Sequence, residues 1–306
     1  MALLNFRRST PSAAPQSAQM EALIQGFSVE VMPRTAEKIT DFRALLPLGT
    51  RVYIAHIEGT PIADMVATAA RLRAEGMEPM PHFPARIIAD RAELGDWVAR
   101  YQGEADVREG LMLGGGPVMP KGAYDNSMQL LETGLFDGFR RLHVAGHPEG
   151  NRDIGPDGGH EIIFQALRWK QDFAAAKGIE MAIVTQFAFE AAPIIAWADG
   201  LRARGITLPV HLGVAGPAKL QTLIKFAIAC GVGPSLSVLQ KRAKDVSKLL
   251  MPFEPTALVA DLAAHKAANP DFAVARLHFF PLGGIKANAD WTFTHGGAAA
   301  RPATQT

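Results

Sequence analysis

Short apolar segments alternate with longer amphipathic segments along most of this chain, and this alternation is the strongest constraint on its fold. The short segments have the length of β-strands and lie at 27–32, 51–57, 77–83, 110–115, 141–147, 180–187, 209–215 and 275–284. The longer segments repeat apolar residues at helical spacing and lie at 61–76, 91–103, 160–178, 192–205 and 217–231. Strands that alternate with helices predict parallel β-α-β units.

Eight such units predict an α/β protein built as a single (β/α)8 TIM barrel, with an open doubly wound sheet as the alternative fold. The segment 235–270 is longer than the other connections, so we expect an extra helix there, before strand eight. The barrel is expected to span 23–295 as one catalytic domain. The two ends, 1–22 and 296–306, are expected to be disordered tails.

Composition excludes several classes of function. The chain has 306 residues with 31 Lys and Arg against 30 Asp and Glu, so it lacks the basic excess of a nucleic-acid-binding protein. One cysteine excludes an internal disulfide. No segment approaches the roughly 18–20 apolar residues that a membrane helix needs, and no signal peptide is evident. We therefore expect a cytoplasmic protein without a membrane partner, and the sequence leaves a homo-oligomer open.

The first predicted strand, "FSVEVM", carries a carboxylate at its centre. Alternate residues of a strand share a face, so Ser28 and Glu30 point one way while Val29 and Val31 point the other. A lone carboxylate on such a strand is costly to bury unless another group pairs with it or the chemistry uses it. Glu30 is therefore a candidate catalytic residue, with a structural ion pair as the alternative.

Polar residues and glycines follow several of the predicted strands, where the active site of a (β/α)8 barrel lies. They are His56, Glu58, His82, Gly114, Gly115, Gly116, His147, Glu149, Gln186, Gly283 and Gly284. Each histidine taken alone is more often structural than functional. No pair of them has the helical spacing of metal ligands, so no metal site is predicted. The run "GGGP" lacks the dinucleotide-binding pattern G-x-G-x-x-G, and "GVAGPAK" fits either a phosphate-binding turn or a plain one.

Taken in order, several motifs resemble the methylenetetrahydrofolate reductase family of flavin-dependent barrel enzymes. The motifs in this chain are "FSVEVMP", "PHF", "AGHPEGN", "RWK", "VTQFAFE" and "KFA", and the likeness runs from about Phe27 to Phe280. The forty-residue spacing from Gln186 to Phe226 matches that family. The ordered set is more specific than any single motif.

The resemblance implies that FAD carries a hydride between 5,10-methylenetetrahydrofolate and 5-methyltetrahydrofolate. It implies Glu30 as the general acid, and Gln186 and Phe226 as contacts of the folate substrate. It implies cofactor contacts at Tyr53, His82, Leu113, Gly114, Gly115, Tyr124, Ala145, His147, Asn151 and Lys170. NADH or NADPH is left open as the reductant. A carboxyl group on an apolar barrel wall is expected to have a raised pKa, which suits a general acid.

The chain departs from that family in the fourth strand. The family has a motif of the type L-R-G-D there, and this chain has Leu113 in place of the Arg and Gly115 in place of the Asp. Loss of the Asp removes a negative charge beside the flavin and favours its reduced, anionic form. We therefore expect methyltetrahydrofolate oxidation to be favoured. The alternatives are a flavin-free methyltransferase of the folate-barrel type and a non-catalytic barrel that binds folate or flavin.

Overall fold

A computed structural model describes residues 13–151, 153–155, 159–230, 238–240 and 252–296. Eight parallel strands close into a barrel in the order of the sequence, which confirms the predicted single (β/α)8 fold and excludes the open sheet. The strands are β1 (Ser28–Val31), β2 (Arg51–Ile54), β3 (Glu78–Pro84), β4 (Glu109–Leu113), β5 (Arg141–Gly146), β6 (Glu180–Ala188), β7 (Val210–Ala215) and β8 (Val274–Phe280). All eight overlap the strands predicted from the sequence.

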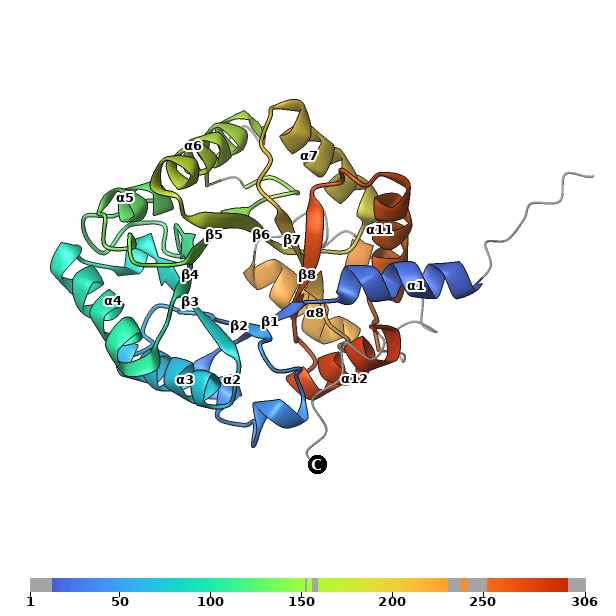
Figure 1. Ribbon diagram of the computed structural model, residues 1–306, viewed down its shortest axis with the longest axis horizontal. Helices are drawn as coiled ribbons and strands as arrows, with labels where there is room; N and C mark the ends of the chain where they lie inside the picture. The colour runs from blue at the N-terminus through green and yellow to red at the C-terminus, as the bar shows by residue number, and fades with distance from the viewer. Residues whose placement is uncertain (1–12, 152, 156–158, 231–237, 241–251, 297–306) are drawn as a thin grey trace, which may run out of the picture.

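Helices surround this ring of strands (Figure 1). They are α2 (Pro33–Ala36), α3 (Ile62–Ala74), α4 (Arg91–Ala105), α5 (Ser127–Glu132), α6 (Glu161–Lys177), α7 (Ala191–Ala203), α8 (Leu220–Ala229), α11 (Thr256–Ala268) and α12 (Ile285–His295), with short 3-10 turns at Phe42–Ala44 and Ala85–Ile87. Outward-facing strand residues such as Val29, Val52, Leu142 and Leu212 pack against the helices in one apolar core. None of the helices in the described part of the chain is long and apolar enough to cross a membrane.

The N-terminal boundary of the ordered domain differs from the predicted one. Residues 13–22 were expected to belong to a disordered tail, but they form most of helix α1 (Ala13–Ile24), which packs against α11 (Figure 1). The Ala- and Ser-rich composition suggests a tail, yet Met20, Leu23 and Ile24 bury their side chains in the core and hold the helix in place. The remaining tail residues, 1–12 and 297–306, lie outside the described residues, and so do 235–237 and 241–251 of the segment where the extra helix is expected.

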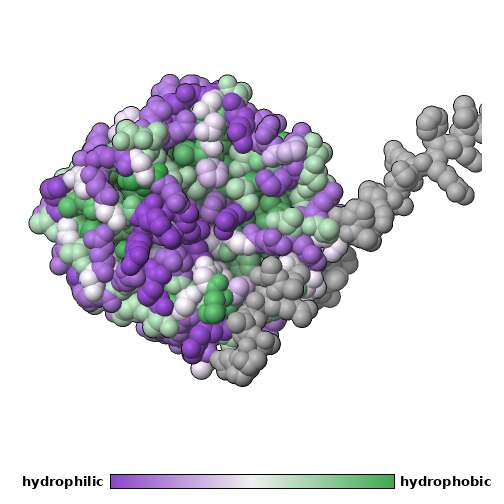
Figure 2. Space-filling view, in the orientation of Figure 1, coloured by the Kyte–Doolittle hydropathy of each residue, from purple (hydrophilic) through white to green (hydrophobic). Residues whose placement is uncertain are grey.

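The inside of the barrel is unusually polar. Branched apolar side chains dominate the interior of most TIM barrels, and here Tyr53, Met80, Leu111 and Val184 form only a small apolar cluster. Four histidines and an ion cluster fill much of the remaining interior, as described below. The face shown in Figure 2 also gathers hydrophilic residues near its centre, over the strands.

Glu109, at the start of β4, is the centre of the ion cluster. Its carboxylate is fully buried and accepts hydrogen bonds from Arg51 Nε at 2.5 Å, Arg140 Nη2 at 2.5 Å and Arg141 Nη1 at 2.8 Å. Burial raises the pKa of this carboxyl, but the hydrogen bonds and charges of the three arginines outweigh burial and hold the pKa below its usual range. Arg141 also pairs with Glu180, so the cluster joins β2, β4, β5 and β6.

Replacement of Glu109 by glutamine is expected to lower the free energy of unfolding by about 3 kcal/mol, because three guanidinium groups lose their shared buried partner. Urea unfolding followed by circular dichroism at pH 7 measures this change. The matched control is Glu104→Gln, which removes one exposed ion pair with Arg100 and should cost less than about 0.5 kcal/mol. Equal losses in the two variants would contradict the structural role of Glu109.

Candidate functional site

Glu30 faces two histidines at the carboxyl ends of the strands. Its Oε2 atom lies 3.3 Å from His82 Nε2 on β3 and 3.9 Å from His278 Nε2 on β8. Strand closure explains this meeting, because β8 pairs directly with β1 and places His278 opposite Ser28. The strand alternation predicted for Ser28 and Glu30 is therefore correct, and both side chains point into the barrel.

The expected raised pKa of Glu30 is wrong. Burial raises the pKa of this carboxyl, but hydrogen bonds and charge from His278 and His82 outweigh burial and lower the pKa to about 2. The barrel wall around Glu30 is not apolar, since histidines from two other strands complete it. At neutral pH the ligand-free site therefore holds a carboxylate.

Further polar side chains lie beneath Glu30 in the barrel. Ser28 Oγ lies 2.9 Å from His278 Nδ1, and the Tyr53 hydroxyl lies 2.5 Å from His143 Nδ1. The His143 and His211 rings meet edge to face with centroids 4.6 Å apart. Tyr53, one of the predicted cofactor contacts, is completely buried, and its hydroxyl pairs with His143.

His147 and Lys170 form a second group, between the end of β5 and the middle of α6. Lys170 is buried and has no hydrogen bond or ion pair within the described residues. Burial alone lowers the pKa of its ammonium to about 8. Burial, and then the nearby charge of Lys170, lower the pKa of His147 to about 4. A buried cation without a counter-ion fits the phosphate of a cofactor such as FAD.

The loop after β4 supplies glycines and a buried aromatic ring. Gly115 has a φ of +104°, a conformation that favours glycine, and the Gly114 carbonyl accepts a hydrogen bond from the Arg86 backbone. Leu113 is partly exposed at the strand end and Tyr124 is buried farther along this loop. Leu113, Gly114 and Gly115 are thus adjacent and partly exposed at this strand end.

Arg86 fixes this loop and was missed by the sequence analysis. Its guanidinium donates to Asp125 Oδ1 at 2.9 Å, to Asp153 Oδ2 at 2.6 Å and to the Pro117 carbonyl at 3.2 Å. The loops after β3, β4 and β5 are therefore tied together. Asn151 accepts a hydrogen bond from the Asp153 backbone and Ala145 lies partly exposed on β5, so both predicted residues border this tied region.

Gln186 sits at an irregularity in β6. The register of β6 with β7 shifts between Val184 and Phe187, and such bulges redirect side chains. Gly213 on β7 accommodates the shift, since a Cβ atom there would lie 2.3 Å from the Thr185 carbonyl oxygen. Phe226 is partly buried on α8 against the apolar cluster that contains Phe187. The two predicted folate contacts thus border the same cluster.

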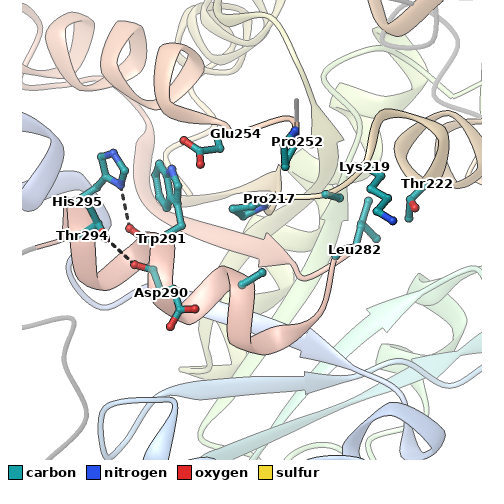
Figure 3. Close-up of a pocket in the computed structure, with 13 residues that line it drawn as sticks. Pro217, Lys219, Thr222, Pro252, Glu254, Leu282, Asp290, Trp291, Thr294 and His295 are labelled. Atoms are coloured by element: carbon teal, nitrogen blue, oxygen red, sulfur yellow. Dashed lines mark hydrogen bonds between the residues drawn. The ribbon is translucent and has the colours of Figure 1, made fainter. Parts of the chain in front are cut away.

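A separate cavity of about 710 Å³ opens between the loops after β7 and β8 and one face of α12. Figure 3 shows Lys219, Thr222 and Leu282 on one side of it and Trp291 and His295 on the other. The Trp291 and His295 rings stack with centroids 4.5 Å apart. None of the predicted catalytic, folate or cofactor residues lines this cavity, so it is distinct from the Glu30 site.

In the described part of the chain, no group of three or more His, Cys, Asp and Glu side chains is arranged to hold a metal ion. Two roles were not predicted from the sequence: His278 as a partner of Glu30, and Ser28 as the partner of His278. A signal for them was present, because "FSVE" and "RLHFF" each place a polar side chain among apolar neighbours on a strand. Only closure of the barrel between its first and last strands brings them together.

Comparison with known proteins supports the fold. No protein-family model matches this chain. Its structure is similar to that of a protein described as an uncharacterized protein from Clostridium thermocellum that binds two copies of 5-methyl-5,6,7,8-tetrahydrofolic acid. The TM-score is 0.53 at 10% sequence identity, and the match covers 90% of this chain and 96% of the other. At this identity the likeness establishes the shared barrel fold.

Replacement of Lys170 by methionine is expected to stabilise the ligand-free protein by roughly 3 kcal/mol at pH 7, since a buried unpaired charge is removed. The pKa of Lys170 is lower in the folded than in the unfolded chain, so the wild-type protein gains stability as pH rises from about 8 towards 10.5. Urea unfolding at pH 7 and pH 10 should therefore show a smaller difference between the two proteins at pH 10.

The control for this substitution lies on the same helix. Lys177 pairs with Asp137 near the surface, and Lys177→Met should change stability by less than about 1 kcal/mol at either pH. A Lys170→Met variant less stable than wild type at pH 7 would show that Lys170 has a counter-ion in the folded protein.

Proposed function

We propose that this protein binds a reduced folate and FAD at the carboxyl end of its barrel and oxidises 5-methyltetrahydrofolate to 5,10-methylenetetrahydrofolate. The observation that carries the proposal is the ionised Glu30 beside His82 and His278 at the barrel mouth. The motif resemblance supports the choice of folate and flavin. The folate that the structurally similar protein is described as binding is consistent with it.

The proposed reaction removes a hydride and a proton from the substrate. Bound FAD would supply the acceptor for the hydride that leaves the methyl carbon. Closure of the methylene bridge onto the neighbouring folate nitrogen forms a carbon–nitrogen bond and releases the proton of that nitrogen. Glu30 is placed to take this proton, since its lowered pKa keeps the carboxyl ionised at neutral pH. In the reverse direction the same carboxyl returns the proton.

Other residues of the chain bind and orient the two ligands in this proposal. Gln186 orients the pterin by hydrogen bonding from the β6 irregularity, and Phe226 stacks on the aminobenzoate. Lys170 neutralises phosphate charge, which removes the cost of its own burial. Gly115 stands where the resembled family has an aspartate. Without that negative charge the reduced flavin is favoured, which also supports the oxidative direction.

The first test is the absorption spectrum of the purified protein, with FAD added if it is colourless. Anaerobic 5-methyltetrahydrofolate should bleach the flavin band, and NADH is added separately to test reduction from the nicotinamide side. Protein that binds 5-methyltetrahydrofolate in calorimetry but cannot be loaded with FAD would defeat the redox proposal and favour the flavin-free methyltransferase or a binding module. Protein that binds neither 5-methyltetrahydrofolate nor FAD would defeat the folate assignment.

Glu30→Gln should lower the rate of anaerobic flavin reduction by 5-methyltetrahydrofolate by about 100-fold or more, because the proton acceptor is lost. Binding of FAD should be retained, since Glu30 is assigned no part in it. Glu37→Gln, an identical substitution at an exposed site just after the same strand, is the control and should leave the rate unchanged. A Glu30→Gln variant with a near-normal rate would remove Glu30 from the reaction.

A further inference from the structure

We propose that His278, held in place by Ser28, is a positioning residue that fixes the Glu30 carboxylate and keeps it ionised for proton transfer. This inference deepens the proposed function and rests on it for its catalytic meaning. The arrangement itself is a property of the folded chain. It links the first strand to the last through side chains 250 positions apart in the sequence.

The His278 ring is held on several sides. Its Nδ1 atom lies 2.9 Å from Ser28 Oγ, and its ring centroid lies 4.3 Å from that of Tyr53 and 4.8 Å from that of Phe280. The side chain is 1% exposed. Because a serine holds one nitrogen and two aromatic rings pack against the imidazole, the other nitrogen stays directed at Glu30.

His82 faces the same carboxylate oxygen with less support. Its Nε2 atom is nearer to Glu30, at 3.3 Å, but its side chain is 11% exposed, and among the described residues no hydrogen bond holds its ring as Ser28 holds that of His278. Its ring approaches Tyr53 only at a centroid distance of 6.3 Å. His82 is also the side chain that the resemblance assigns to the flavin. His278 is therefore the fixed partner of Glu30, and His82 is the partner nearer the ligand.

Burial favours the neutral form of three other titratable groups near Glu30, which are Tyr53, Cys230 and His278. Burial raises the pKa of the Tyr53 hydroxyl far above its usual range, and burial and the charge of Glu30 raise the pKa of the Cys230 thiol to about 11. Burial lowers the pKa of His278, while the hydrogen bond and charge of Glu30 oppose that effect. The charges of His82 and, from deeper in the barrel, Arg51 also disfavour a protonated His278.

Two substitutions of His278 distinguish the roles of its two ring nitrogens. Asparagine places a polar atom near the position of Nδ1 and can keep the Ser28 contact, but it removes the group directed at Glu30. Glutamine reaches towards the position of Nε2 and can still donate to Glu30, but it loses the Ser28 contact. Ser28→Ala keeps the imidazole and removes only its support. His211→Asn is the control, because His211 is equally internal but contacts His143 rather than Glu30.

The test is a pH titration of the Glu30 carboxyl carbon by NMR in protein labelled with ¹³C-glutamate, with the signal assigned by its loss in Glu30→Gln. His278→Asn should raise the titration midpoint of Glu30 by about one pH unit or more, since burial is then opposed by His82 alone. Ser28→Ala and His278→Gln should give smaller shifts in the same direction. His211→Asn should leave the midpoint unchanged.

Rates of anaerobic flavin reduction by 5-methyltetrahydrofolate complete the test. The acid limb of the pH profile should move up with the NMR midpoint in His278→Asn, while the KM for folate above pH 8 stays unchanged. The inference is overturned, even if the enzyme is active, when the titration midpoint of Glu30 is unchanged in both His278 variants. If neither His278 variant folds, an unchanged Glu30 midpoint in Ser28→Ala overturns it. A shifted midpoint in a protein without folate turnover keeps the positioning of Glu30 and defeats the proposed function instead.

Discussion

The buried carboxylate of Glu109 is the interaction on which the barrel depends most. It gathers three guanidinium groups at the amino-terminal end of the strands and leaves none of them without a partner there. Charges of both signs inside a barrel are tolerated only when they compensate each other closely. This cluster allows the rest of the interior to be polar, because the charges beneath the histidines are paired with one another.

A polar column continues from that floor to the barrel mouth. Tyr53 meets His143 within the column, and the Tyr53 ring packs against His278, which in turn faces Glu30. Each contact joins different strands, so the column also locks the register in which the strands close. In most barrels the inward-facing positions are used only for packing. Here the residues at these positions also determine the charge of Glu30.

The strands and helices followed from local sequence periodicity, which is why all eight predicted strands appear in the structure. Helix α1 was missed because its composition resembles a tail, and the buried contacts of Met20, Leu23 and Ile24 that hold it form only in the folded chain. Arg86 was missed for a related reason. Its three acceptors lie on loops whose approach depends on the closed barrel, and no local pattern marks it.

The sequence by itself determined the fold class and placed Glu30 on an inward-facing strand position, since alternation and spacing are properties of neighbouring residues. It also put a lysine at position 170 within a helix. Only the tertiary structure decided that this lysine is buried without a counter-ion among the described residues and that Glu30 is ionised. The state of a charge depends on every group around it, and the groups around Glu30 come from strands at opposite ends of the chain.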